Sequence, residues 1–135
     1  MGERVTGRCL CGAVTFEAVV EEPTVDACHC GSCRRWSGHV WASVNAAFDT
    51  LHLKSGADDL TWYLSSEVVR RGFCRVCGAS LFWHPDRHPE YAWMVGVAAG
   101  ALDAPTGLRL ASHIFTSERG DYYPIDDGLP QRPRF

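Results

Sequence analysis

Seven cysteines constrain the fold of this 135-residue chain more than any other feature of its sequence. They form three groups, listed in chain order: Cys9 and Cys11; Cys28, Cys30 and Cys33; Cys74 and Cys77. An odd number of cysteines cannot all pair as disulfides, and close spacing of this kind suits metal thiolates better than bridges. The cysteines therefore predict metal sites in a protein of a reducing compartment.

Length and composition predict one domain over residues 1–135. Hydrophobic residues make up 46% of the chain and charged residues 21%, which is enough apolar material to bury a core. No run approaches the roughly 20 apolar residues that cross a bilayer, and the first residues lack the apolar stretch of a signal peptide. The net charge of −3, without an extended basic face, disfavours nucleic acid as a partner. We expect a soluble, cytoplasmic protein that acts on small molecules, and the sequence leaves its oligomeric state open.

The hydrophobic pattern predicts a mainly β fold of antiparallel sheets with little helix. Short alternating or β-branched segments are typical of strands, and clusters of Gly, Pro and Asp separate them, as expected of turns. The expected strands are 12–20, 40–44, 51–53, 60–64, 68–73, 80–83, 91–97 and 108–115, with turns at 21–23, 55–59, 84–86 and 103–107. Short helical turns are expected at 32–36 and 98–102, and an irregular segment draped over the sheets from Thr116 onward.

The first and last cysteine groups predict a closed four-sulfur site. Cys9-x-Cys11 and Cys74-x-x-Cys77 are each followed directly by a glycine, whose positive φ lets backbone N–H groups approach the thiolates. Four sulfurs in two such turns are typical of a structural zinc site, which would cross-link the beginning and the middle of the chain. Iron is the alternative, although iron sites of this kind normally use two Cys-x-x-Cys turns.

The middle group, at positions 28 to 33, offers three sulfurs and no obvious fourth ligand. Zinc with three protein ligands keeps a position for water or substrate, so this count predicts an open, catalytic-type site suited to an incoming thiolate. We expect His29 to point away from the flanking cysteines and to pack or support them. His39 and His113 are candidates for a fourth ligand. A closed second site and a partly oxidised cluster are the alternatives.

The remaining polar and aromatic residues have plainer interpretations. Arg34, Arg71 and Arg75 are expected at the surface, with a cradle for a small anionic ligand as the alternative. The five tryptophans are expected in the core: Trp36, Trp41, Trp62, Trp83 and Trp93. Ser65-Ser66 lacks the Gly-x-Ser-x-Gly context of a serine hydrolase, and the pairs Asp58-Asp59 and Asp126-Asp127 are expected in turns.

The order of the motifs resembles the glutathione-dependent formaldehyde-activating enzyme family, which also includes centromere protein V. The residues that carry the resemblance are Gly7-x-Cys9-x-Cys11-Gly12-x-Val14, Cys28-His29-Cys30-x-x-Cys33-Arg34, Arg71-x-Phe73-Cys74-x-x-Cys77-Gly78-x-x-Leu81, His113-Ile114-Phe115 and Asp127-Gly128-Leu129-Pro130. The resemblance implies a β-tent of antiparallel sheets around a structural zinc. It also implies that Cys9, Cys11, Cys74 and Cys77 hold that zinc, and that Cys28, Cys30 and Cys33 form a second zinc site.

The family's reaction is the reversible joining of formaldehyde to glutathione, that of S-(hydroxymethyl)glutathione synthase, a carbon–sulfur lyase. The resemblance therefore implies a small aldehyde and a glutathione-like thiol as partners and Zn²⁺ as cofactor. Arg34, Arg71 or Arg75 would then be candidates to hold a glutathione carboxylate. Because the sequence shows no convincing general base, a non-enzymatic zinc module that binds glutathione, another thiol or a protein partner is the alternative.

Overall fold

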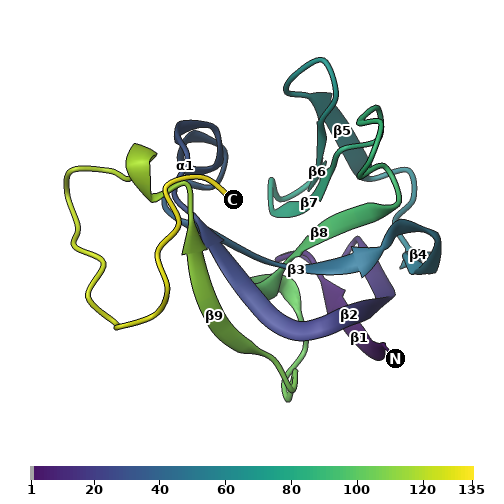
Figure 1. The fold of residues 1–135 in the computed structure, drawn as a ribbon. Coiled ribbons are helices and arrows are strands. Elements are labelled where there is room, and N and C mark those ends of the chain that lie inside the picture. The colour runs from purple at the N-terminus through teal and green to yellow at the C-terminus, as the bar shows by residue number, and fades with distance from the viewer. Residues whose placement is uncertain (1) are drawn as a thin grey trace.

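The computed structural model describes residues 2–135, in which nine strands form one connected, strongly bent sheet beside a single α-helix (Figure 1). The strands are β1 (Glu3–Arg8), β2 (Thr15–Cys28), β3 (Trp41–Ala47), β4 (His52–Ser55), β5 (Leu60–Leu64), β6 (Arg70–Cys74), β7 (Ser80–His84), β8 (Met94–Ala98) and β9 (Arg109–Ile114). The helix is α1 (Gly31–Ser37), and 3-10 turns occur at η1 (Phe48–Thr50), η2 (Ala99–Ala101) and η3 (Thr116–Glu118). The predicted mainly β fold with little helix is confirmed.

The sheet is built around the long strand β2, which the picture shows curving along the base of the molecule (Figure 1). The strand order is β1-β2-β3-β8-β7-β6-β5, and β4 and β9 also pair with β2. The first half of β2 pairs with β1 and β4, and the second half with β3 and β9. Only the β2–β9 pair is parallel among the described strands, so the sheet is predominantly antiparallel, as predicted.

The prediction of a turn at residues 21–23 is wrong. The chain stays extended there, and the register with β3 shifts between Val20 and Val25. An irregular stretch with a proline can bend a strand instead of ending it, because such positions need not donate to the ladder. The bend carries Cys28 to the far end of β2, beside α1. The strand β1 was also absent from the predicted set, since it offers only Val5 and Gly7 as inward positions.

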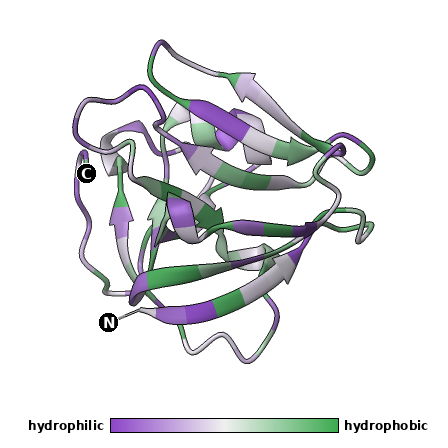
Figure 2. Ribbon diagram, turned by 90° about the vertical axis from the view of Figure 1, so that its right-hand side faces the viewer, coloured by the Kyte–Doolittle hydropathy of each residue, from purple (hydrophilic) through white to green (hydrophobic). Residues whose placement is uncertain are grey.

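Alternation along the strands produces the core. Phe16, Ala18 and Val20 point inward on β2, and hydrophobic and hydrophilic residues alternate along several strands (Figure 2). The strand β8 is buried at all five positions, as expected of a strand covered on both faces. Phe16 contacts Phe82 of β7 edge to face, with ring centroids 4.9 Å apart, and this contact ties the β1–β4 part of the sheet to β5–β7.

The backbone pairing between these two parts of the sheet is limited. Strands β7 and β8 are paired only through Phe82 with Val97 and Trp83 with Gly96. A cluster of four cysteines supplies a second connection, between the loop after β1 and the β6–β7 turn: Cys9, Cys11, Cys74 and Cys77. The β5–β7 strands therefore depend on side-chain contacts for their position.

The segment after β9 is irregular, as predicted, and returns along the edge of the sheet. The backbone N–H of His113 donates to Pro130 O, and that of Arg132 donates to His113 O, at 2.9 Å each. The C-terminal segment thus covers the free edge of β9 next to α1 (Figure 1). Within residues 2–135, no helix has the length and apolar character needed to cross a membrane.

Candidate metal centres

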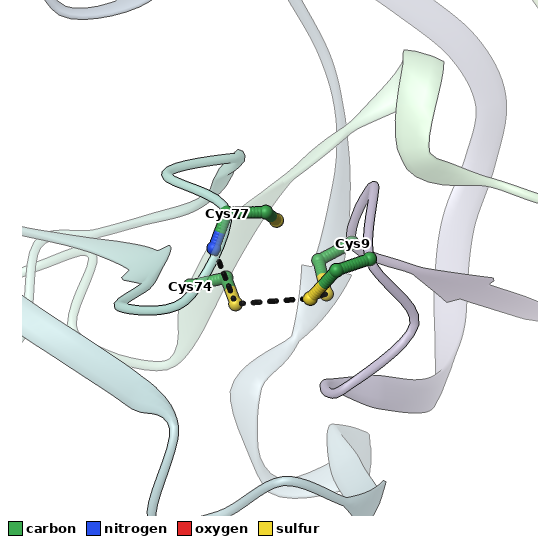
Figure 3. A group of neighbouring side chains, drawn as sticks. Cys9, Cys74 and Cys77 are labelled. Carbon is green, nitrogen blue, oxygen red and sulfur yellow. Dashed lines mark hydrogen bonds between the residues drawn. The ribbon is translucent and has the colours of Figure 1, made fainter.

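Two loops bring four cysteine sulfurs together. Cys9 and Cys11 follow β1, while Cys74 ends β6 and Cys77 lies in the turn to β7. All four sulfurs lie within 4.8 Å of one another, with Sγ–Sγ distances of 3.6 Å for Cys9–Cys11 and 3.9 Å for Cys11–Cys74. Figure 3 shows Cys9 facing Cys74 and Cys77 across the gap between the loops.

The spacing of these sulfurs fits a tetrahedral ion. Thiolates about 2.3 Å from zinc lie about 3.8 Å apart at the corners of a tetrahedron. Backbone N–H groups also point at the sulfurs: Val14 N donates to Cys9 Sγ at 3.3 Å, and Cys77 N donates to Cys74 Sγ at 3.5 Å. The cluster is therefore built to hold negative charge on sulfur, and its cysteines are free of disulfides.

The glycine after each pair has the predicted left-handed backbone. Gly12 has a φ of 82° and Gly78 a φ of 78°. The Gly78 N–H donates to Cys74 O at 2.8 Å, and the Gly12 N–H donates to Cys9 O at 3.2 Å. A side chain at either position would be strained, so these glycines allow each turn to close on its sulfurs.

The other three cysteines meet where β2 passes into α1. The sulfurs of Cys28, Cys30 and Cys33 lie within 4.8 Å of one another, and Cys28 and Cys33 are buried. Cys30 caps the helix, since its sulfur accepts a hydrogen bond from Cys33 N at 3.3 Å. Thiol hydrogen bonds from Cys28 and Cys33 lower the pKa of Cys30 to about 2, which concentrates negative charge on this sulfur.

Neither candidate histidine joins these three sulfurs. Among residues 2–135, the group of potential metal ligands at this site consists of the three cysteines alone. Both ring nitrogens of His113 are occupied, by His29 and Asp127, and His39 Nδ1 contacts the Tyr122 hydroxyl at 2.5 Å. In the described residues, the sulfurs of Cys28, Cys30 and Cys33 therefore come together without a histidine beside them.

His29 points away from the flanking cysteines, as expected, and takes part in a buried series of hydrogen bonds. Its Nδ1 lies 2.8 Å from the Tyr123 hydroxyl and its Nε2 lies 2.8 Å from His113 Nδ1, while His113 Nε2 lies 2.8 Å from Asp127 Oδ2. Because the Asp127 carboxylate can only accept, neutral rings orient the series in one direction, with Tyr123 donating to His29, His29 to His113 and His113 to Asp127.

The electrostatics of this series of hydrogen bonds agree with that orientation. Burial, followed by the nearby positive charge of His113 when protonated, lowers the pKa of His29 and favours its neutral ring. The Leu129 N–H and then the His113 ring lower the pKa of Asp127. The network anchors the residue between Cys28 and Cys30 to both β9 and the C-terminal segment.

The hydrogen bond between His113 and Asp127 was not predicted from the sequence, in which Asp127 was expected in a turn. Asp127 does accept a turn hydrogen bond from Leu129 N at 3.0 Å, and it also pairs with His113. The signal was present in the His113-Ile114-Phe115 and Asp127-Gly128-Leu129-Pro130 motifs. Their partnership spans 14 positions and no local period reveals it.

The three candidate arginines lie in different environments. Arg34 Nε donates to His29 O at 3.2 Å, so it supports the cysteine loop, and Arg75 forms an exposed ion pair with Asp59 at 2.8 Å. The expectation of a surface position is wrong for Arg71, which is 6% exposed and donates to Cys33 Sγ at 3.5 Å.

The expectation of core tryptophans holds for only part of the set. Trp41 is buried, and with the half-buried Trp36 and Trp83 it packs around Cys28 and Cys33. These three rings form an apolar wall beside the three-cysteine cluster. Trp62 packs against the main core, whereas Trp93 is 54% exposed, so the prediction is wrong for Trp93.

A cavity of about 780 Å³ lies beside the four-cysteine cluster, where Cys9 and Gly78 belong to its lining. Cys9 borders it on one side, and Trp36, Trp41 and Ala98, which pack against the three-cysteine cluster, border it on another. Arg8 and Asp103 place opposite charges on its lining. The lining therefore offers both a positive and a negative side chain.

Comparison with known proteins finds a matching family model, a similar sequence and a similar fold. Residues 4–118 match the family model described as glutathione-dependent formaldehyde-activating enzyme. A Schizosaccharomyces pombe protein named as an uncharacterized lyase is 35% identical over 79 residues, which cover 57% of this chain and 55% of that protein, so the match spans about half of the relative. A crystal structure of a Rhodobacter sphaeroides protein is 24% identical with a TM-score of 0.64, covers 94% of this chain and 98% of that one, and supports the fold.

Proposed function

Because the chain belongs to the glutathione-dependent formaldehyde-activating enzyme family, we propose that it is a zinc-dependent carbon–sulfur lyase. It would join glutathione or a similar thiol to a small aldehyde and release both in the reverse direction. The observation that carries this proposal is the division of seven cysteines into a set of four and a separate set of three. The relative named as a lyase supports the same class of activity.

The two clusters would have different roles. Cys9, Cys11, Cys74 and Cys77 would hold a structural zinc, since four sulfurs complete a tetrahedral shell. The three sulfurs at positions 28 to 33 would hold a second zinc with one position left for an exogenous ligand. Zinc bound there supplies Lewis acidity, which favours the thiolate form of a thiol substrate.

The reaction balances without an oxidant or reductant. The substrate thiolate attacks the carbonyl carbon of the aldehyde, so that a carbon–sulfur bond forms and the carbonyl π bond becomes an alkoxide. The alkoxide then takes up one proton, equal to the proton that the thiol lost. In the reverse direction the hydroxyl proton leaves, the carbon–sulfur bond breaks, and the aldehyde and thiol separate.

The cavity beside Cys9 would hold the body of the thiol. Glutathione carries carboxylates and an ammonium group, and Arg8 and Asp103 offer a complementary pair of charges on the lining. The wall formed by Trp36 and Trp41 would exclude water from the side next to the three-cysteine cluster. This placement assigns the charged ends of the substrate to the cavity and requires its sulfur to reach past Trp36 and Trp41 to the three-cysteine cluster.

The proposal extends to the domain, its compartment and its partners. Residues 1–135 would act as one formaldehyde-activating-type zinc domain in the cytoplasm, with small-molecule partners and no role for nucleic acid or membrane. In the alternative function, a non-enzymatic zinc module, the same clusters would bind a thiol or a protein partner without exchanging an aldehyde. The open three-sulfur set favours the enzyme.

Exchange NMR of formaldehyde with glutathione tests the proposal on the zinc-loaded protein. We expect wild type to accelerate exchange, and Cys28→Ser and Cys30→Ser to lose this acceleration while remaining folded. Ser32→Ala changes an exposed serine between the cysteines and serves as the matched control. Folded cysteine variants that exchange as fast as wild type would contradict the catalytic role.

Metal analysis under reducing conditions provides a second, independent measurement. The proposal requires two zinc ions per chain in wild type. A protein that binds one ion, retained in Cys33→Ser and lost in Cys77→Ser, would contradict a metal at the three-cysteine cluster. Two ions without catalysed exchange would favour the non-enzymatic module.

A further inference from the structure

Arg71 brings a buried positive charge to the three-cysteine cluster. It lies on β6, 38 positions from Cys33, and only the tertiary fold brings the two residues together. Its Nη1 donates to Cys33 Sγ at 3.5 Å, and the whole residue is 6% exposed. A guanidinium stays charged in proteins, so this contact places a fixed positive charge against sulfur.

Neighbouring side chains hold the guanidinium in this position. Its Nε donates to the Ser65 hydroxyl at 3.1 Å, and its Cζ lies 5.1 Å from the centre of the Trp36 ring. The neighbouring Arg70 projects elsewhere, onto the Trp62 ring and His84, because successive residues of a strand face opposite sides. Arg71 is thus oriented by contacts that Arg70 does not share.

The thiolates are the available counter-charge for Arg71. In the described part of the chain, the side-chain ion pairs involve Arg4, Lys54, Arg70, Arg75 and His113. None of them brings a carboxylate to Arg71. A buried charge without a partner is costly, so the position of Arg71 is explained by negative charge on the Cys33 sulfur that it contacts and on the cluster to which this sulfur belongs.

Charge counting shows what the arginine does for the centre. Three thiolates and one divalent cation carry a net charge of −1, and Arg71 brings the total to zero. Without it, a fourth thiolate would approach a centre that already carries negative charge in a partly buried setting, where repulsion is stronger than in water. With Arg71 present, binding of the fourth thiolate changes the net charge of the centre from zero to −1.

We propose that Arg71, oriented by Ser65, neutralises the three-cysteine centre and thereby favours the binding of a divalent metal and of an anionic thiolate as its fourth ligand. This inference rests on the proposed function, because it requires a metal at positions 28 to 33. It replaces the expectation that Arg71 holds a carboxylate of the substrate, since two of its nitrogens are already engaged inside the protein. Arg71 is a positioning residue that acts through the metal centre.

Metal competition with a chromophoric chelator tests the inference on the full chain. We expect Arg71→Gln to weaken binding of the second Zn²⁺ by about 10- to 100-fold, the range typical of lost partners of metal ligands, and to leave the first ion unchanged. Arg35→Gln removes the same charge from an exposed position on α1 and should change neither affinity. Arg71→Lys, which keeps the charge, should restore part of the lost affinity.

Cobalt substitution tests the thiolate part of the inference without measuring catalysis. Binding of glutathione sulfur to Co²⁺ changes its visible absorption, and we expect Arg71→Gln to need a higher glutathione concentration for the same change. Ser65→Ala removes only the hydroxyl that orients the arginine, so it remains testable if Arg71→Gln does not fold, and it should weaken the second ion by a smaller factor.

The outcomes separate the two proposals. If wild type binds one metal ion, the proposed function fails and the role of Arg71 fails with it. If wild type binds two ions while Arg71→Gln and Arg35→Gln bind the second ion and glutathione equally well, only the role of Arg71 is overturned. Unchanged second-ion affinity in Ser65→Ala likewise overturns the orientation by Ser65.

Discussion

The four-cysteine cluster should act as a cross-link whose loss destabilises the whole domain. The double variant Cys74→Ser/Cys77→Ser removes both sulfurs that the β6–β7 turn contributes. Cys11 and Cys74 are 63 positions apart, and a cross-link that closes a loop of this length stabilises the folded state by about 4 kcal/mol through chain entropy. This is a large part of the roughly 5–15 kcal/mol that holds a typical domain folded.

The expected effect on thermal unfolding follows from the chain length. With an unfolding entropy of about 2 cal/mol/K per residue, a loss of about 4 kcal/mol lowers the midpoint of this 135-residue chain by about 15 °C. Circular dichroism of the zinc-loaded proteins under reducing conditions measures this shift. Wild type treated with a strong chelator should show a loss of similar size, since the cross-link is then removed without a mutation.

The matched control is Cys28→Ser/Cys30→Ser, which also removes two sulfurs and keeps the Cys33 sulfur that Arg71 contacts. Its cluster closes only the short loop from Cys28 to Cys33, so its entropic contribution is smaller. The same relation gives about 2 kcal/mol for this short loop, so we expect a shift of about half that of the first variant. Equal shifts for the two double variants, or a chelated wild type with an unchanged midpoint, would refute the cross-link argument.

Two further predictions concern buried hydrogen bonds. His84 Nδ1 accepts from Arg70 Nε at 3.2 Å, and burial lowers its pKa from 6.5, so the unfolded state binds more protons and stability should fall as the pH drops below about 6.5. His84→Gln should flatten this dependence in urea unfolding between about pH 7 and 5, and a slope equal to that of wild type would contradict the assignment. Tyr123→Phe removes the hydroxyl that donates to His29 and should cost about 1–3 kcal/mol, because a buried acceptor loses its partner. Urea unfolding measures this loss of unfolding free energy. Tyr122→Phe, at a residue 60% exposed, should cost less than half as much. Equal losses for the two variants would contradict the role given to the buried hydrogen bond between Tyr123 and His29.

Features set by neighbouring residues could be predicted from the sequence. The strand at 60–64 was predicted with its observed bounds, and the helical turn around Ser32 falls within α1. Gly12 and Gly78 have the expected positive φ because each closes a turn whose geometry depends on a few adjacent residues. In contrast, the bend in β2 was missed, since a proline and two glutamates fit a turn as well as an irregular strand.

Features set by distant partners could not be predicted in the same way. Arg71 had the sequence context of an ordinary surface arginine, and His113 and Asp127 had no visible connection. Burial decides the role of each of these residues, and burial depends on which elements pack against it. The candidate fourth ligands at His39 and His113 were separated from the sulfurs for the same reason.

The sequence by itself determined the grouping of the cysteines, because ligand turns are local and each keeps its spacing wherever the chain folds. The spacing therefore indicated a set of four and a set of three. Only the tertiary structure decided that the two outer groups lie within 4.8 Å of one another. It also decided that Arg71 faces the middle group, since contacts across 38 positions depend on how β6 packs beside α1 and not on any local pattern.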